Sequence, residues 1–156
     1  MRAGIVVLSL LLAGSAPAVA QGGPQPSPGD VFTWRAAPPN LPKGAEIAVV
    51  SGDPAKKGPF VVRLKLPANY VIPPHRHATV EQITVLYGVL NVGMGEKLDK
   101  TRTKRYERGD HLSIPANAPH YALTGNQTII QLNGTGPYAM DYIDPATDPS
   151  KPPPTQ

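Results

Sequence analysis

Two histidines and a glutamate stand close together in the stretch PHRHATVEQITVLYG. His75 and His77 are separated by one residue, and Glu81 follows four residues after His77. In a strand, residues i and i+2 point to the same face, so His75 and His77 can project together, and Glu81 keeps the same parity. Burying that carboxylate without a partner would be costly, whereas a divalent cation would compensate it. The alternative is a pair of surface histidines with Glu81 in an ordinary salt bridge.

A second segment can bring another histidine to the same place. Residues 109–120 read GDHLSIPANAPH, which predicts a glycine turn, a short strand, a proline turn at Pro115 and then His120. His120 could therefore return to the first segment from a neighbouring strand. Imidazole nitrogens together with a carboxylate suit Fe, Mn, Co, Ni, Cu or Zn.

Together the two segments resemble the cupin superfamily. The first cupin motif, G-x5-H-x-H-x3-4-E-x6-G, is matched over 69–88, with Asn69 in place of the first glycine. The second motif, G-x5-P-x-G-x2-H-x3-N, is matched over 109–124, with Asn117 at the second glycine and Thr124 at the terminal asparagine. Asparagine tolerates positive φ better than most residues, so the two asparagines are mild departures.

The resemblance implies an all-β fold, a cupin-type jelly-roll β-barrel that commonly pairs as a homodimer through outer strands. It also implies one divalent transition metal inside the barrel, held by His75, His77, Glu81 and His120. Four protein ligands leave positions open on a five- or six-coordinate ion, and a small-molecule ligand or substrate can use them.

The rest of the sequence agrees with an all-β domain. Apolar residues recur with period 2, and Gly, Pro and Asn punctuate the runs. The strand-like stretches are 46–50, 60–66, 81–93, 111–114 and 128–134. At most one short helix is expected, near residues 96–104.

Both ends differ in composition from the domain at 31–143. Residues 21–30 are predicted to be a flexible Pro/Gly-rich lead, and 144–156 a Pro-rich disordered tail.

Residues 1–20 have the organisation of a secretory signal peptide. Arg2 gives a positive start, the apolar run 5–13 is short for a bilayer span, and Ala18-Val19-Ala20 fits a small-x-small cleavage site. We expect cleavage before Gln21 and a periplasmic or secreted protein; the alternative is an N-terminal membrane anchor. No second apolar segment is long enough to span a membrane.

Composition excludes several functions. The sequence has no cysteine, so it offers no thiol nucleophile, thiolate ligand or redox dithiol. Removing Arg2 with the signal peptide lowers the formal charge from +4 to +3, which is too mild to indicate nucleic-acid or membrane binding. The basic segment 97–108 is read as a solvated loop or turn, with an anion site as the alternative.

Residues beyond the metal-binding set are weaker candidates. Tyr87 shares the parity of Glu81, Tyr121 adjoins His120, and Gln131 lies on a strand expected to line the barrel. The fourth histidine, His111, is expected to be exposed. No catalytic residue besides the metal ligands can be identified, because the sequence shows no separate general base.

Three functions follow from these observations. The first is a metal-dependent enzyme, with dioxygenase, decarboxylase or isomerase chemistry on a small oxygen-rich molecule. The second is a non-catalytic periplasmic module that binds a metal or a small ligand. The third is a cupin in which a metal serves stability alone.

Overall fold

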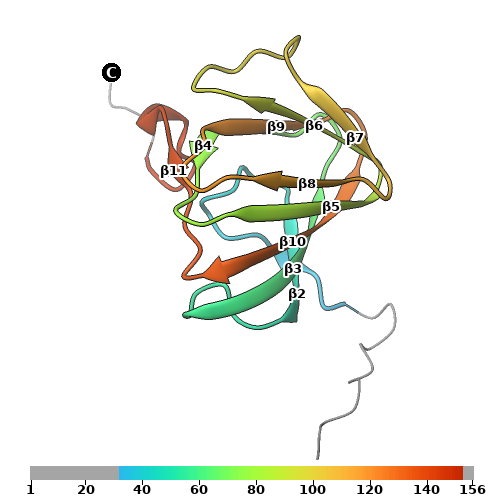
Figure 1. The fold of residues 1–156 in the computed structure, drawn as a ribbon, viewed down its shortest axis with the longest axis vertical. Coiled ribbons are helices and arrows are strands. Elements are labelled where there is room, and N and C mark those ends of the chain that lie inside the picture. Colours follow the sequence, from blue (N-terminus) through green and yellow to red (C-terminus); the bar gives the residue numbers. More distant parts are fainter. Residues whose placement is uncertain (1–31, 153–156) are drawn as a thin grey trace, which may run out of the picture.

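The computed structural model describes residues 32–152, which form two antiparallel β-sheets packed face to face (Figure 1). The predicted signal peptide, 1–20, and the predicted lead, 21–30, lie outside the described residues. Within 32–152 the structure is nearly all β and forms the jelly roll that the motifs implied.

The larger sheet has six strands and the smaller has five. In spatial order the larger sheet contains β1 (Arg35–Ala36), β2 (Glu46–Ser51), β3 (Gly58–Leu66), β10 (Thr128–Gly136), β5 (Glu81–Tyr87) and β8 (His111–Ile114). The smaller sheet contains β11 (Asp141–Tyr142), β4 (Val71–Arg76), β9 (His120–Thr124), β6 (Val89–Met94) and β7 (Lys104–Glu107). Strands that are distant in sequence therefore lie side by side, as β3 and β10 do.

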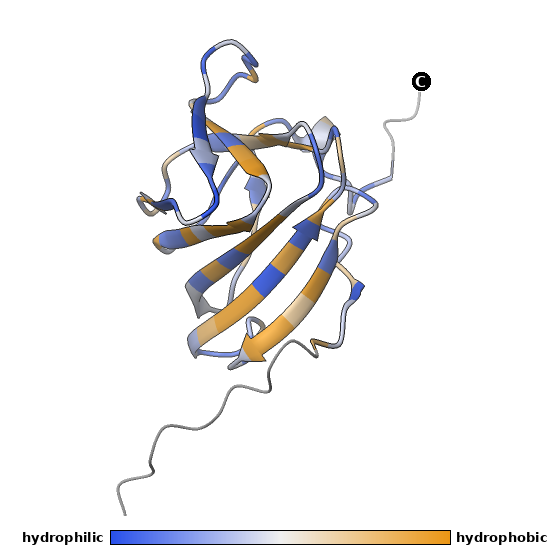
Figure 2. Cartoon of the chain, turned by 90° about the vertical axis from the view of Figure 1, so that its right-hand side faces the viewer, coloured by the Kyte–Doolittle hydropathy of each residue, from blue (hydrophilic) through white to orange (hydrophobic). Residues whose placement is uncertain are grey.

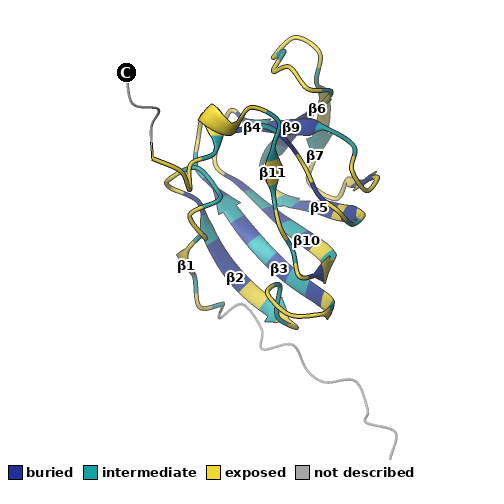
Figure 3. Ribbon diagram, turned by 90° about the vertical axis from the view of Figure 1, so that its left-hand side faces the viewer, coloured by how far each residue is buried: buried dark blue, intermediate teal, exposed yellow. Residues whose placement is uncertain are grey.

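The core lies between the sheets because the strands alternate apolar and polar residues. Along β3, Phe60, Val62, Leu64 and Leu66 are buried, and the residues between them are only partly covered. Figure 2 shows the resulting hydropathy bands, and Figure 3 shows the matching bands of burial on β2 and β3. The period-2 prediction for this strand is confirmed.

The predicted run 81–93 is divided in two by a turn at Gly88. Gly88 has φ +78°, and a Cβ there would overlap the Gln127 carbonyl oxygen. Only glycine fits both conditions, so β5 ends in one sheet and β6 begins in the other.

The segment 96–104 contains no helix. The Asp99 carboxylate accepts hydrogen bonds from the Thr101 amide and hydroxyl, and its carbonyl accepts one from the Arg102 amide. These bonds close a turn, and β7 begins at Lys104. The sequence left room for at most one short helix near residues 96–104, and the structure has a turn there instead.

Among residues 32–152 the one helix is a 3₁₀ turn, η1 (Pro145–Thr147), capped by the Asp144 side chain. It is far too short to cross a membrane, and the described part of the chain offers no other candidate. η1 lies in the segment predicted to be a disordered tail, and residues 153–156 of that segment lie outside the described range.

Candidate metal centre

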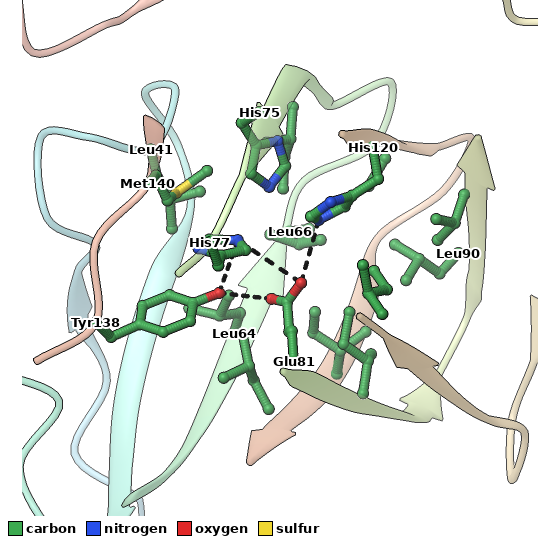
Figure 4. A pocket seen from close by; sticks show the side chains of 17 residues that line it. Leu41, Leu64, Leu66, His75, His77, Glu81, Leu90, His120, Tyr138 and Met140 are labelled. Carbon is green, nitrogen blue, oxygen red and sulfur yellow. Dashed lines mark hydrogen bonds and ion pairs between the residues drawn. The ribbon is translucent and has the colours of Figure 1, made fainter. Parts of the chain in front are cut away.

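Four buried polar side chains converge between the two sheets (Figure 4). His75 lies on β4, His77 follows that strand directly, and His120 begins β9 as the register partner of His75. Glu81 begins β5 in the opposite sheet. Each of the four is at most 5% exposed. The turn after β8 brings His120 to the first motif, as the sequence predicted.

The three imidazoles are oriented by main-chain carbonyls. The pairs are His75 Nδ1 with Pro73 O at 2.7 Å, His77 Nδ1 with Ala139 O at 2.7 Å, and His120 Nδ1 with Ala118 O at 3.0 Å. A carbonyl oxygen only accepts, so each Nδ1 carries the hydrogen and each Nε2 keeps a free lone pair. One ring nitrogen of each histidine lies within 4.8 Å of those of the other two, which is the arrangement of histidines that share a metal ion.

Glu81 contributes a carboxylate oxygen that lacks a hydrogen bond. Tyr138 Oη donates to Glu81 Oε1 at 2.6 Å, whereas no hydrogen bond reaches Oε2. Oε2 lies 3.2 Å from His120 Nε2 and 3.7 Å from His77 Nε2. A buried, unpartnered carboxylate oxygen beside free nitrogen lone pairs is a favourable environment for a cation.

The electrostatics of the site keep His75 and His77 neutral and the carboxyl of Glu81 ionised. Burial, followed by the proximity of His120, lowers the pKa of His75 to about 3. Burial also lowers the pKa of His77. For Glu81, burial alone would raise the pKa, but the neighbouring imidazoles and the Tyr138 hydroxyl outweigh it and lower the pKa to about 2. Neutral imidazole and ionised carboxylate are the forms that bind metals.

Tyr138 is a member of the site that sequence reasoning missed. It lies on the segment 137–143, here called the C-terminal strap, which follows β10 and contains β11 (Figure 3). Its ring stacks on His77 at 4.4 Å between centroids, and its Oη lies 3.0 Å from His77 Nε2. Burial and the Glu81 charge raise its pKa well above the usual value. No motif spacing marks this residue, because the fold of the strap alone brings it to Glu81.

The two asparagines at motif glycine positions adopt the conformation expected of them. Asn69 has φ 56° and Asn117 has φ 60°. The Asn117 amide donates to His77 O at 2.7 Å, so the second motif is fastened to the first. Thr124, at the motif's last asparagine, is buried; its hydroxyl donates to Pro67 O at 2.6 Å and accepts from the Tyr70 amide.

The three weaker candidates lie away from the four candidate metal ligands. Tyr87 is 56% exposed, because a bulge opposite Ile129 and Ile130 breaks the strand parity at the end of β5. Tyr121 points to the opposite face of β9 from His120, and its hydroxyl donates to Asp99 O at 2.8 Å. Gln131 faces outward beside Arg63. None of the three lines the cavity described below, so the expectation that they line the pocket is corrected.

The fourth histidine, His111, is exposed on β8, as expected. Its Nδ1 lies 3.0 Å from Thr84 Oγ1, on the outer face of the larger sheet.

A cavity of about 50 Å³ adjoins the four candidate ligands. It has room for roughly three or four water molecules. Apart from the three histidines, Glu81 and Tyr138, its walls are apolar, and no lysine or arginine of the described range lines it. A negative charge placed in this cavity would find its compensating charge on a bound metal alone.

Comparison with known proteins identifies the fold through structure alone. No protein-family model matches the sequence, and no curated protein matches it significantly. Among solved structures, the polyketide cyclase RemF from Streptomyces resistomycificus aligns with TM-score 0.61 and 20% identity, over 75% of this chain and 84% of its own. An RmlC-like cupin from Shewanella frigidimarina aligns with TM-score 0.54 and 13% identity, over 69% of this chain and 86% of its own.

An oxalate oxidase is also similar, with TM-score 0.51 and 17% identity, over 69% of this chain and 59% of its own. At these identities the similarity concerns the fold. It agrees with the two facing antiparallel sheets. The protein therefore has the fold of the cupin superfamily.

Proposed function

We propose that the protein is an exported enzyme that uses one divalent transition metal to act on a small oxygen-rich molecule. The metal ligands are His75, His77, Glu81 and His120. One observation carries the proposal: three imidazole lone pairs and an unpartnered carboxylate oxygen converge in a buried cavity. A cation there compensates all four atoms at once, whereas a proton on His120 would compensate Glu81 and leave His75 Nε2 without a partner.

The donor set fits several metals and excludes others. Three neutral nitrogens and one carboxylate oxygen suit Fe, Mn, Co, Ni, Cu or Zn, whereas Ca²⁺ and Mg²⁺ prefer oxygen ligands throughout. When bound, such a metal supplies Lewis-acid chemistry, and a redox-active one supplies electron transfer as well.

Tyr138 supplies the hydroxyl group of the cavity. Because its pKa is raised, it keeps its proton at neutral pH and acts as a hydrogen-bond donor rather than as a base. Its Oη lies at the centre of the site, between Glu81 Oε1 and His77 Nε2. Its single proton is given to Glu81 Oε1, so the hydroxyl holds the carboxylate in place and can donate to a substrate oxygen only by exchanging that bond. This arrangement suits decarboxylation, isomerisation or dioxygenation of a substrate that binds through oxygen.

The similarity to a polyketide cyclase and an oxalate oxidase supports a catalytic use of the fold, since both of those proteins are enzymes. The alternative function is a non-catalytic periplasmic module that holds a metal or a small ligand. The small size of the cavity favours that alternative, because little more than an ion and a few waters fit there.

Metal analysis of variants tests the proposal. Full-length protein is purified without a His-tag, incubated with each candidate metal and desalted. We expect one bound ion per chain in the wild type, and a large loss in His120→Ala and in Glu81→Gln. His111→Ala is the matched control, because it removes an exposed histidine outside the site. Full metal content in both site variants would refute the ligand assignment.

Activity separates the enzyme from the carrier. Metal-loaded wild type is incubated with a panel of dicarbonyl compounds and hydroxy acids, and substrate loss is followed by mass spectrometry. Turnover that disappears in Glu81→Gln supports the enzyme. Stoichiometric binding of metal or ligand without turnover supports the carrier.

Export and assembly are part of the proposal. Ala18-Val19-Ala20 supports removal of residues 1–20, and N-terminal sequencing of exported protein should begin at Gln21. The resemblance to cupins supports a homodimer, which sedimentation of the mature protein would detect as twice the chain mass.

A further inference from the structure

A second cavity, here called the apolar chamber, lies beside the metal cavity. It measures about 260 Å³, roughly five times the volume of the metal cavity. Its lining comprises Pro38, Asn40, Leu41, Ile47, Pro54, Ala55, Phe60, Val62, Leu64, Leu132, Tyr138 and Met140. No charged side chain of the described residues lines it, and Asn40 and Tyr138 supply its only polar side-chain atoms.

The two cavities share a wall. Leu64 and Leu132 on the larger sheet, Leu41 before β2, and Tyr138 and Met140 on the C-terminal strap line both. Tyr138 also contributes a different chemical group to each of the two cavities. Its hydroxyl meets Glu81 in the metal cavity, and its ring packs edge-on against Phe60 in the chamber at 5.3 Å between centroids. Figure 4 shows Tyr138, Leu41 and Met140 together on one side of the ligands.

Solvent exposure shows where the metal cavity can be reached. Every residue that lines it is buried except Leu41, Tyr138 and Met140, which are half-buried. All three belong to the shared wall. The chamber has exposed residues at its rim, among them Pro38 and Ala55. The partly exposed part of the metal cavity's lining is therefore the wall that it shares with the chamber.

The strap that carries Tyr138 and Met140 is fastened along its length. The Tyr138 amide donates to Pro54 O at 2.8 Å, the Ala139 carbonyl accepts from His77 Nδ1 at 2.7 Å, and Tyr142 Oη donates to Asn40 O at 2.8 Å. These bonds join the strap to His77 and to the segments at the chamber rim that carry Pro54 and Asn40. Hydrogen bonds therefore hold the strap side of the shared wall in place.

We propose that the apolar chamber binds the body of the substrate and is the entrance to the metal cavity. The inference rests on the proposed function. The metal cavity holds only a few non-hydrogen atoms, so a larger substrate must extend into the chamber. The substrate class is then a small molecule with an oxygen-bearing head, such as a carboxylate, and an uncharged aliphatic or aromatic body. A sugar or a short dicarboxylate would leave its polar groups without partners against these walls.

A series of straight-chain carboxylates tests this proposal. Acetate, butanoate and hexanoate are titrated into full-length protein loaded with Co²⁺ and followed by calorimetry and by the visible spectrum of the metal. In the wild type, affinity should rise with chain length, by up to about fourfold for each methylene that enters the chamber.

Ala55→Phe supplies the blocking variant, because Ala55 lines the chamber at its exposed rim and does not line the metal cavity. It should abolish the dependence on chain length while leaving Co²⁺ content and acetate affinity unchanged. Ala146→Phe is the control, since it adds the same ring to an exposed alanine on η1 that lines neither cavity. The control should keep the wild-type series.

Two results obtained with Co²⁺-loaded protein would overturn the chamber proposal. One is a carboxylate affinity that does not change with chain length, and the other is a rise in affinity with chain length that persists in Ala55→Phe. Failure to bind Co²⁺ is read separately by metal analysis. It would remove the proposed function and, with it, the inference that rests on it.

Discussion

Tyr138 Oη donates a 2.6 Å hydrogen bond to Glu81 Oε1, across 57 residues of sequence. The bond leaves Oε2 facing the imidazoles of His77 and His120. A ligand carboxylate that is held through one oxygen presents the other in a fixed direction. The C-terminal strap therefore takes part in building the candidate metal centre, although it lies outside both cupin motifs.

Replacing Tyr138 with Phe should weaken metal binding. The change keeps the ring that stacks on His77 and removes the hydroxyl that orients Glu81. Loss of such an outer partner typically costs about 10- to 100-fold in metal affinity. Competition with a fluorescent zinc chelator measures the effect. Tyr142→Phe is the control, because it removes a hydroxyl from the same strap whose bond goes to Asn40 O. Equal affinities for the two variants would contradict an orienting role.

The sequence identified the four candidate ligands because they lie on local patterns. His75 and His77 share strand parity, and the turn at Pro115 leads to His120. The resemblance to cupins then joined the two segments. The strands could be predicted for a similar reason, since apolar alternation over 60–66 and 128–134 depends only on nearest neighbours.

The pocket walls were predicted less well, because they depend on tertiary structure. Strand alternation already places Gln131 opposite to Ile130 and Leu132, and Tyr121 opposite to His120. Tyr87 has the parity of Glu81, and only the bulge in the pairing with β10 turns it outward. For Tyr138 no local signal exists, since its position depends on the path of the strap across the barrel.

Acid should destabilise the metal-free protein. His75 and His77 have lowered pKa values in the folded state, so they stay neutral while the unfolded chain takes up protons below about pH 6.5. Stability is therefore lost as pH falls from about 6.5 toward 3, by about 1.4 kcal/mol per pH unit for each proton. Glu81, whose pKa is also lowered, adds a loss of the same sign below about pH 4.5.

Urea unfolding with EDTA at about pH 7.5 and about pH 5.5 measures this dependence. His75→Asn removes one of the two groups, so its unfolding free energy should depend less steeply on pH over this interval. Equal stability of the wild type at the two pH values would show that these imidazoles do not remain neutral on folding.

Gly93 is predicted to tolerate no side chain, because the ring of Tyr121 lies against it. A Cβ at this position would overlap the ring, and Tyr121 is only 1% exposed with its hydroxyl bonded to Asp99 O. Gly93→Ala should lower the free energy of unfolding by about 1–3 kcal/mol. Thermal or urea unfolding provides the measurement.

Gly125→Ala is the matched control for Gly93→Ala. A Cβ at Gly125 meets nothing within 4 Å. The free energy of unfolding of this variant should stay unchanged or rise by up to about 1 kcal/mol, since alanine restricts the unfolded chain. Similar losses in both variants would mean that the contact with Tyr121 is not the cause.

Substitutions at Asn117 test whether stability depends on the backbone conformation or on the side chain at this motif position. Its φ of 60° is left-handed, its side chain is exposed, and its amide donates to His77 O. Asn117→Gly keeps both the amide and the conformation, so stability and metal content should stay near wild type. Asn117→Ala keeps the amide and the Cβ but loses the polar side chain through which asparagine tolerates this φ. The free energy of unfolding should fall by up to about 1–2 kcal/mol.

The control is Asn126→Ala, at an exposed asparagine that lacks positive φ, where a change within about 0.5 kcal/mol is expected. Urea unfolding of the three variants gives the comparison. If Asn117→Gly were destabilised as much as Asn117→Ala, the asparagine side chain itself would be required, and the substitution of asparagine for glycine in this motif could not be explained by backbone conformation. If Asn117→Gly alone also lost metal, the link from Asn117 to His77 would depend on more than the backbone amide.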